Sequence, residues 1–174
     1  MRFGEPVVEA EAGVRERSAD GEFDAFWSAD HSAVLALAAA LTGDWNTAED
    51  LTQDAFAALH GRWDEVENPA AWVRRVVTNR AASHWRRRVR EAAALARLAA
   101  RPAAVALAPE HDEFWATVRA LPRREAQVVA LYYVDDRSIA QIATLLGIAE
   151  GTVKATLSHA RASLARALAV EEES

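Results

Sequence analysis

The chain has 174 residues and a formal net charge of −6, and 51% of its residues are hydrophobic. It contains no cysteine, which excludes a disulfide framework, a thiolate metal site and a cysteine nucleophile. No apolar run reaches the length of about 18 residues that predicts a membrane span, and residues 1–20 lack the apolar stretch of a signal peptide. We therefore expect a cytoplasmic protein that does not contact membranes.

The first expected elements are an acidic tail and two helices. Residues 1–21 are polar and show no hydrophobic period, which predicts a disordered acidic tail. From Glu22 to Thr42 the apolar residues recur at helical spacing. A second helix is predicted from Thr47 to His60, because Thr47 and Asp50 stand three residues apart, as in a capping box.

A third predicted helix begins after Asn68, which can cap it, and Pro69 then occupies the first turn, where a missing N–H does no harm. Trp72, Val73, Val76 and Val77 can form its core-facing side. The same spacing predicts that Arg74, Arg75 and the later arginines point away from the core.

Positive charge is concentrated on this third helix. Residues 71–101 hold nine arginines and one acid, whereas residues 1–70 hold four basic and fifteen acidic side chains. An acidic protein that gathers its arginines into one segment is typical of a chain that meets a polyanion there, and nucleic acid is the main candidate. A solvated basic face is the alternative interpretation.

Residues 98–110 contain two prolines around an uncharged stretch, which predicts a flexible linker between two domains. A short helix with Phe114 and Trp115 is expected next, and Leu121-Pro122 opens another. Asp135-Asp136 is interpreted as the turn that ends this helix. We thus expect an all-α protein of two small helical domains, at 22–97 and 111–170.

The segment from Ser138 to Ala165 has the pattern of a helix-turn-helix. Ser138 and Gln141 match a capping box. Ala143, Gly147 and Val153 supply the small residue at the helix crossing, the glycine of the turn and the branched residue of the second helix. The outward residues at the start of that helix are small or polar, as entry into the DNA major groove requires. An ordinary helical hairpin is the alternative.

With these motifs in order, the chain resembles the extracytoplasmic-function sigma factors of bacterial RNA polymerase, in the sigma-70 family. Its Ala48-Glu49-Asp50-Leu51-Thr52-Gln53-Asp54-Ala55-Phe56 run matches the family's second region. Trp72, Asn79 and Arg86-Arg87-Arg88 follow at suitable spacing. Leu121-Pro122 and Gly151-Thr152-Val153-Lys154 match the fourth region. Trp85-Arg86-Arg87-Arg88 points toward actinobacterial subgroups.

The resemblance implies roles for the matched residues. The polymerase-binding residues would be Glu49, Asp50, Gln53 and Asp54, which would dock on the coiled coil of the largest subunit. The −10 promoter element would be contacted by Asn79, Arg80, Trp85, Arg86, Arg87 and Arg88, and the connector Trp63 to Asn68 would capture a flipped base. The −35 element would be read by the helix-turn-helix, through Thr152, Lys154, Ala155, Ser158 and His159. Anti-sigma factors are common partners in the group.

The sequence also departs from the family pattern. Thr156, His159 and Ala126 stand where the family often has arginine, and Ser83 stands where it often has an acid. Fewer cations predict weaker phosphate contact by the second domain.

We expect no enzyme activity, no cofactor and no metal site, because the five histidines lack metal-ligand spacing and no glycine-rich phosphate loop is present. Two other functions stay open. One is a stand-alone helix-turn-helix regulator, which would not need the acidic helix at Glu49 to Asp54. The other is a sigma-like adaptor that lacks promoter recognition.

Overall fold

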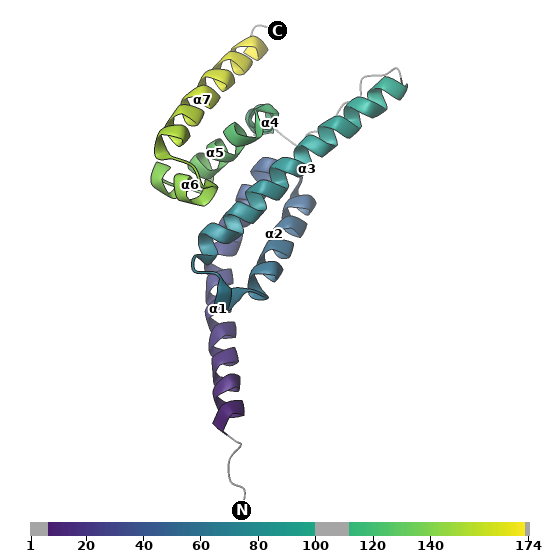
Figure 1. The fold of residues 1–174 in the computed structure, drawn as a ribbon. Coiled ribbons are helices and arrows are strands. Elements are labelled where there is room, and N and C mark those ends of the chain that lie inside the picture. Colours follow the sequence, from purple (N-terminus) through teal and green to yellow (C-terminus); the bar gives the residue numbers. More distant parts are fainter. Residues whose placement is uncertain (1–6, 100–111, 173–174) are drawn as a thin grey trace, which may run out of the picture.

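The structure, a computed structural model, describes residues 7–99 and 112–172. Within these ranges the chain forms seven α-helices, one short 3-10 helix and no strand (Figure 1). The elements are α1 Val7–Thr42, α2 Trp45–His60, η1 Trp63–Glu65, α3 Pro69–Ala99, α4 Asp112–Ala120, α5 Arg123–Tyr133, α6 Ile139–Leu146 and α7 Glu150–Glu172. The predicted all-α fold is confirmed. None of these described helices is both long enough and apolar enough to cross a membrane.

Helices α1 to α3 form a first module. Their shared core contains Val34, Leu35 and Ala38 of α1, Ala48, Ala55, Phe56 and Leu59 of α2, and Val73 and Val77 of α3. These residues recur three, four or seven positions apart along each helix, so each helix buries one apolar stripe. The three helices therefore converge on one core, as the spacing predicts.

The helix ends in this module differ in part from expectation. Helix α1 already begins at Val7, so residues 7–21 continue the helix where a disordered tail is expected. Their many glutamate, alanine and arginine residues favour helix even without an apolar stripe. Helix α2 begins at Trp45, before Thr47, because the Asp44 carboxylate accepts a hydrogen bond from the Thr47 backbone N–H at 2.7 Å. These contacts lower the pKa of Asp44.

The start of α3 agrees with the prediction. The Asn68 side-chain oxygen accepts a hydrogen bond from the Ala71 backbone N–H at 3.0 Å, and Pro69 is the first helical residue. The helix then continues without interruption to Ala99, so its second half projects beyond the body of the protein (Figure 1). Residues 98 and 99 of the predicted linker belong to α3, and residues 100–110 lie outside the described residues.

Helices α4 to α7 form the second module, in which α6 and α7 make the helix-turn-helix. Ser138 and Gln141 form the predicted capping box at the start of α6. Gly147 ends α6 in the left-handed conformation, with φ +65. Val153 of α7 is fully buried and Ala143 of α6 nearly so, and both belong to the same apolar cluster. The local geometry of the motif is therefore as the sequence predicts.

The turn of this motif gives a testable expectation. Gly147→Ala should lower the free energy of unfolding by about 1–2 kcal/mol, because a left-handed backbone brings Cβ too close to the following carbonyl oxygen. Gly151→Ala is the matched control: Gly151 lies within α7, and an added Cβ there meets nothing within 4 Å. Urea unfolding measures both variants. Equal effects of the two substitutions would contradict the role given to Gly147.

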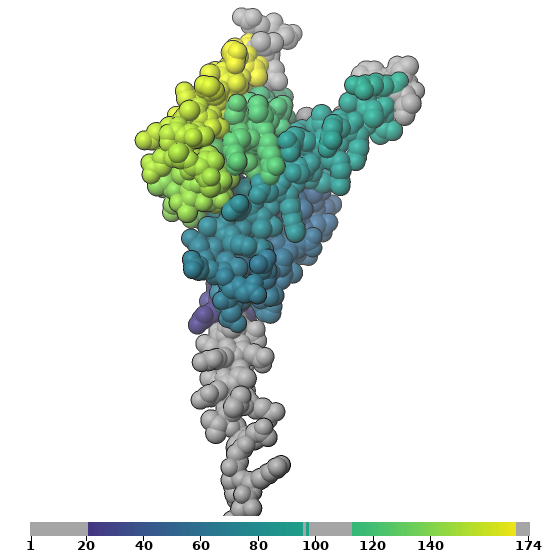
Figure 2. All heavy atoms as spheres, in the orientation of Figure 1, coloured from purple at the N-terminus to yellow at the C-terminus, as the bar shows by residue number. Residues whose placement is uncertain are grey.

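The two modules pack directly on each other. One apolar cluster includes Leu37 and Leu41 of α1 and Ala81 of α3 together with Val118, Leu131 and Leu157 of the second module. Figure 2 shows the second module seated against α3. At Gly43, where φ is +66, an added Cβ would lie 2.8 Å from the Arg119 guanidinium of α4. The modules therefore share a core, in addition to the chain that connects them.

Candidate nucleic-acid interface

The acidic residues matched to polymerase binding lie together on the outer face of α2. Glu49, Asp50, Gln53 and Asp54 are all exposed, and the opposite side of the helix is buried in the first module. Asp54 approaches Arg80 of α3 at 3.8 Å, in a pair that is open to solvent. Trp45, at the start of the same helix, is 58% exposed, although no sequence pattern marks it as a surface residue. We call Glu49, Asp50, Gln53 and Asp54 the α2 acidic face.

The arginines matched to DNA contact lie along the middle and the second half of α3. Arg80, Arg86, Arg87 and Arg90 are exposed, and Arg88 is half-buried. The Arg87 guanidinium and the Glu91 carboxylate, both exposed, form a pair at 3.6 Å. Exposed ion pairs of this kind contribute little to stability, so the arginine can readily exchange its carboxylate partner for a phosphate. This half of α3 is thus a surface where several guanidinium groups can meet a polyanion.

The histidine beside these arginines adds no charge at neutral pH. Burial lowers the pKa of His84, and the positive charges of Arg87 and Arg88 lower it further. Because its ordinary value is 6.5, the imidazole is neutral at pH 7. The positive field of α3 therefore comes from arginine alone.

The outward surface of the helix-turn-helix is open. Thr152, Lys154, Ala155, Ser158 and His159 are all exposed on α7. On the inner side of the same helix, Val153, Leu157 and Ala160 are buried. Helix α7 therefore presents a continuous small and polar strip at its N-terminal half, the shape and chemistry that a major groove accepts.

The connector between α2 and α3 is built around an aromatic cluster. Trp63 packs against Phe23 and Phe26 of α1, with ring centroids 5.3 and 5.4 Å apart. Trp72 is half-buried against the same core. Both tryptophans thus help to hold the first module together, while Asp64, Glu65, Glu67 and Asn68 remain exposed in the connector.

Comparison with known proteins agrees with this arrangement. The chain matches the family model of sigma-70 region 2 over residues 26–91 and that of sigma-70 region 4 over residues 111–164. It is 31% identical to the RNA polymerase sigma-E factor of Streptomyces coelicolor over 156 residues, which cover 87% of this chain and 88% of the relative.

The chain belongs to the sigma-70 family, in its extracytoplasmic-function group.

Two further relatives agree with this assignment. The chain is 30% identical to the ECF RNA polymerase sigma factor SigF of Caulobacter vibrioides, over 72% of this chain and 73% of that protein. Among solved structures, it is similar to the sigma factor RpoE of Bartonella quintana in complex with the anti-sigma factor NepR. That match has a TM-score of 0.66 and 26% identity, and covers 86% of this chain and 98% of the other.

In this sigma factor, two residues matched to −10 contact are covered by the second module. The Asn79 side-chain oxygen accepts hydrogen bonds from Arg123, at the start of α5, and from Gln127 at 2.9 Å. The Arg119 guanidinium lies over the Trp85 ring, 4.9 Å from its centroid. Burial lowers the pKa of Arg123, and the charges of Arg86 and Arg124 lower it further. The sequence gives no indication of these contacts between helices.

One sequence-based expectation is wrong. Arg74 does not point away from the core: it is 2% exposed and pairs with Asp30 of α1 and Asp135 of the second module, each at 2.6 Å. Its neighbours one turn away, Ala70 and Thr78, are small, which leaves room for the second module to approach α3. The sequence pattern of α3 does not indicate this burial, because both partners of Arg74 are distant along the chain.

Asp135 does more than form the turn that ends α5. It follows the end of α5 as expected, but its carboxylate is buried and accepts hydrogen bonds from Arg74 and Arg137, at 2.6 and 2.8 Å. Burial opposes the charged form of Arg74, but the hydrogen bonds and charges of Asp135 and Asp30 outweigh it, so the pKa of Arg74 is raised. These contacts join the two modules through a buried ionic cluster.

Proposed function

We propose that this sigma factor binds core RNA polymerase through the α2 acidic face and contacts the opened −10 element through α3. We further propose that α7 reads the −35 element. The observation that carries this proposal is the separation of charge within the first module. Exposed carboxylates lie on α2 and exposed guanidinium groups lie on α3, so a basic protein and a polyanion can be bound at the same time.

The contact with opened DNA is assigned to Asn79, Arg80, Trp85 and Arg86 to Arg88. Guanidinium groups neutralise phosphates, and an indole ring can stack on an unpaired base. The polymerase supplies the chemistry of RNA synthesis. The sigma factor supplies promoter choice and helps to separate the strands, and so it acts in the cytoplasm, where the chromosome is.

The contact with duplex DNA is assigned to Thr152, Lys154, Ala155, Ser158 and His159. Lys154 is the one residue of this set with a full positive charge, so phosphate contact there is weaker than in relatives with more arginine. Ala126, where such relatives often have arginine, is 3% exposed and packs in the shared core. We therefore propose that the −35 contact discriminates bases more than it adds affinity.

An anti-sigma factor is proposed as a third partner. The Bartonella quintana sigma factor was solved in complex with one. In the present structure Val89 and Leu95 are 45% and 62% exposed on the projecting half of α3, and a partner chain that wraps this helix can cover them.

Transcription from purified components tests the proposal. Core polymerase with this protein should start transcripts from a small subset of sheared genomic fragments, and mapping of their 5′ ends should give one shared promoter motif. Core polymerase alone is the control. Binding to duplex DNA without polymerase and without new transcripts would favour the stand-alone regulator. Co-elution with polymerase without new transcripts would favour the adaptor.

A further inference from the structure

The contact between the modules covers the proposed DNA surfaces unequally. Asn79 and Trp85 of α3 are in contact with Gln127, Arg123 and Arg119 of the second module. The α2 acidic face and the outward strip of α7 are exposed in the same structure. The closed arrangement thus occupies Asn79 and Trp85, while Arg86 and Arg87, the polymerase surface and the duplex-reading surface stay exposed.

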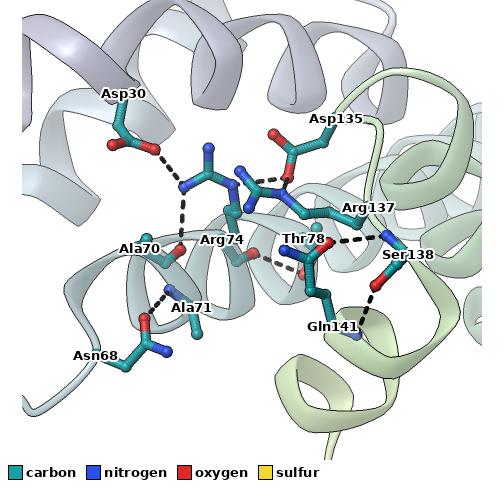
Figure 3. A network of polar contacts seen from close by, with 10 residues as sticks. All are labelled: Asp30, Asn68, Ala70, Ala71, Arg74, Thr78, Asp135, Arg137, Ser138 and Gln141. Carbon is teal, nitrogen blue, oxygen red and sulfur yellow. Dashed lines mark hydrogen bonds and ion pairs between the residues drawn. The ribbon is translucent and has the colours of Figure 1, made fainter. Parts of the chain in front are cut away.

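A four-residue ionic cluster lies at this contact, with two members from each module (Figure 3). Arg74 of α3 pairs with Asp30 of α1 within the first module, at 2.6 Å. Asp135 pairs with Arg137 within the second module, at 2.8 Å. Between the modules, the Arg74 Nε donates to the Asp135 Oδ2 at 2.6 Å. The side chains of Arg74 and Asp135 are 2% and 1% exposed, so the bond that joins the modules is shielded from water.

Because each module contributes one acid and one arginine to the cluster, the contact between the modules is reversible. A buried ion pair that loses one partner leaves an uncompensated charge, which is strongly unfavourable. Here separation of the modules divides the cluster into two pairs, Asp30 with Arg74 and Asp135 with Arg137. Each charge keeps a partner of opposite sign and gains water. The bond between Arg74 and Asp135 can therefore break without leaving any charge both buried and unpaired.

The remaining contact is apolar, and this gives a binding partner a way to shift the equilibrium. Leu41 and Ala81 of the first module pack with Val118 and Leu131 of the second. Opening exposes this area and is unfavourable in the free protein. A partner that binds the open form better than the closed form shifts the population by its difference in affinity.

We propose that the Asp30–Arg74–Asp135–Arg137 cluster is a reversible latch that holds the second module over Asn79 and Trp85 of α3 in the free protein. This inference rests on the proposed function only in assigning Asn79 and Trp85 to single-stranded DNA. It predicts that the free protein binds single-stranded DNA poorly, and that release of the latch improves this binding without changing the affinity for duplex DNA.

The test uses the full chain with Asp135→Asn, which keeps the side-chain shape and removes the charge that pairs with Arg74. Asp136→Asn is the matched control, because Asp136 is the exposed neighbour and its φ of +49 suits asparagine. Since the chain has no cysteine, spin labels can be placed on cysteines introduced at the exposed positions Ala57 of α2 and Ala165 of α7. Pulsed electron resonance then reports the distance between the modules.

Affinity is measured with labelled random-sequence oligonucleotides, one single-stranded and one duplex. Asp135→Asn should lengthen and broaden the label distance and raise single-strand affinity about fivefold or more, the effect of one stacked base. Duplex affinity should stay within about twofold, because the α7 strip is already exposed. Asp136→Asn should match the wild type in all three measurements.

Hydrogen exchange distinguishes opening from unfolding. Amides of α6 and α7 should stay protected in Asp135→Asn, while protection around Arg74 to Ala82 falls. An unchanged label distance, or loss of protection throughout α6 and α7, would overturn the latch. If the variant opens but its affinity for single-stranded DNA does not rise, then the second module does not cover a surface that binds single-stranded DNA. Transcription by the wild type with polymerase tests the proposed function separately, since it does not depend on Asp135.

Discussion

Replacing Asp50 by arginine is expected to abolish co-elution of the protein with core polymerase. Asp50 lies in the middle of the α2 acidic face and is exposed, so its substitution removes no packing contact. Reversing the charge places a cation against a basic partner, and a like-charge contact of this kind costs several kcal/mol. We therefore expect the affinity for core polymerase to fall by about 100-fold or more, and transcription at limiting protein to fall with it.

Asp24→Arg is the matched control for this experiment. Asp24 is also an exposed acid on a helix, but it lies on α1, outside the α2 acidic face. Both variants change the net charge equally and should unfold at the wild-type temperature. Size-exclusion chromatography with core polymerase measures binding. Normal co-elution of Asp50→Arg, or equal loss in both variants, would show that the α2 acidic face does not dock on polymerase.

Replacing Arg86, Arg87 and Arg88 together with alanine is the second change with a large expected effect. Each arginine that neutralises a phosphate releases counterions on binding, which contributes about 0.7–0.9 to the slope of log affinity against log salt. The triple variant, assembled with polymerase, should therefore lose up to about three units of slope in promoter binding. Because these residues are exposed or half-buried on the projecting half of α3, the fold should be retained.

The same three positions changed to lysine provide the control. Lysine keeps the positive charge and the counterion release, but it lacks the planar fork that binds phosphate and base edges in two places. The lysine variant should retain the salt slope and lose part of the preference for promoter over random DNA. Anisotropy titrations at several salt concentrations give both quantities. An alanine variant with the wild-type slope would mean that these arginines do not touch DNA.

Several features of the fold could be predicted because they depend on neighbours in the chain. The capping box of Ser138 and Gln141, the left-handed Gly147 and the cap at Asn68 are all found where their spacing indicates. Each is decided by hydrogen bonds or steric limits within about four residues. The predicted start of α2 is too late. Asp44 and Thr47 are both residue types that cap helices, and in the structure Asp44 is the N-cap.

The exposed site residues could also be located from the sequence. Hydrophobic period fixes which side of a helix is buried, so the α2 acidic face and the outward strip of α7 follow from the positions of apolar residues. Their exposure agrees with that reasoning. The proposed role of each residue, however, came from the family resemblance, because exposure alone does not name a partner.

The helices, the turn of the helix-turn-helix and the separation of charge between α2 and α3 follow from residues that are neighbours along the chain. The burial of Arg74 and the covering of Asn79 and Trp85 follow instead from contacts with distant residues of the second module, namely Asp135, Gln127 and Arg119. Periodicity describes how a helix meets its own core. It carries no information about a second module, whose position is fixed by shape and charge complementarity between distant surfaces.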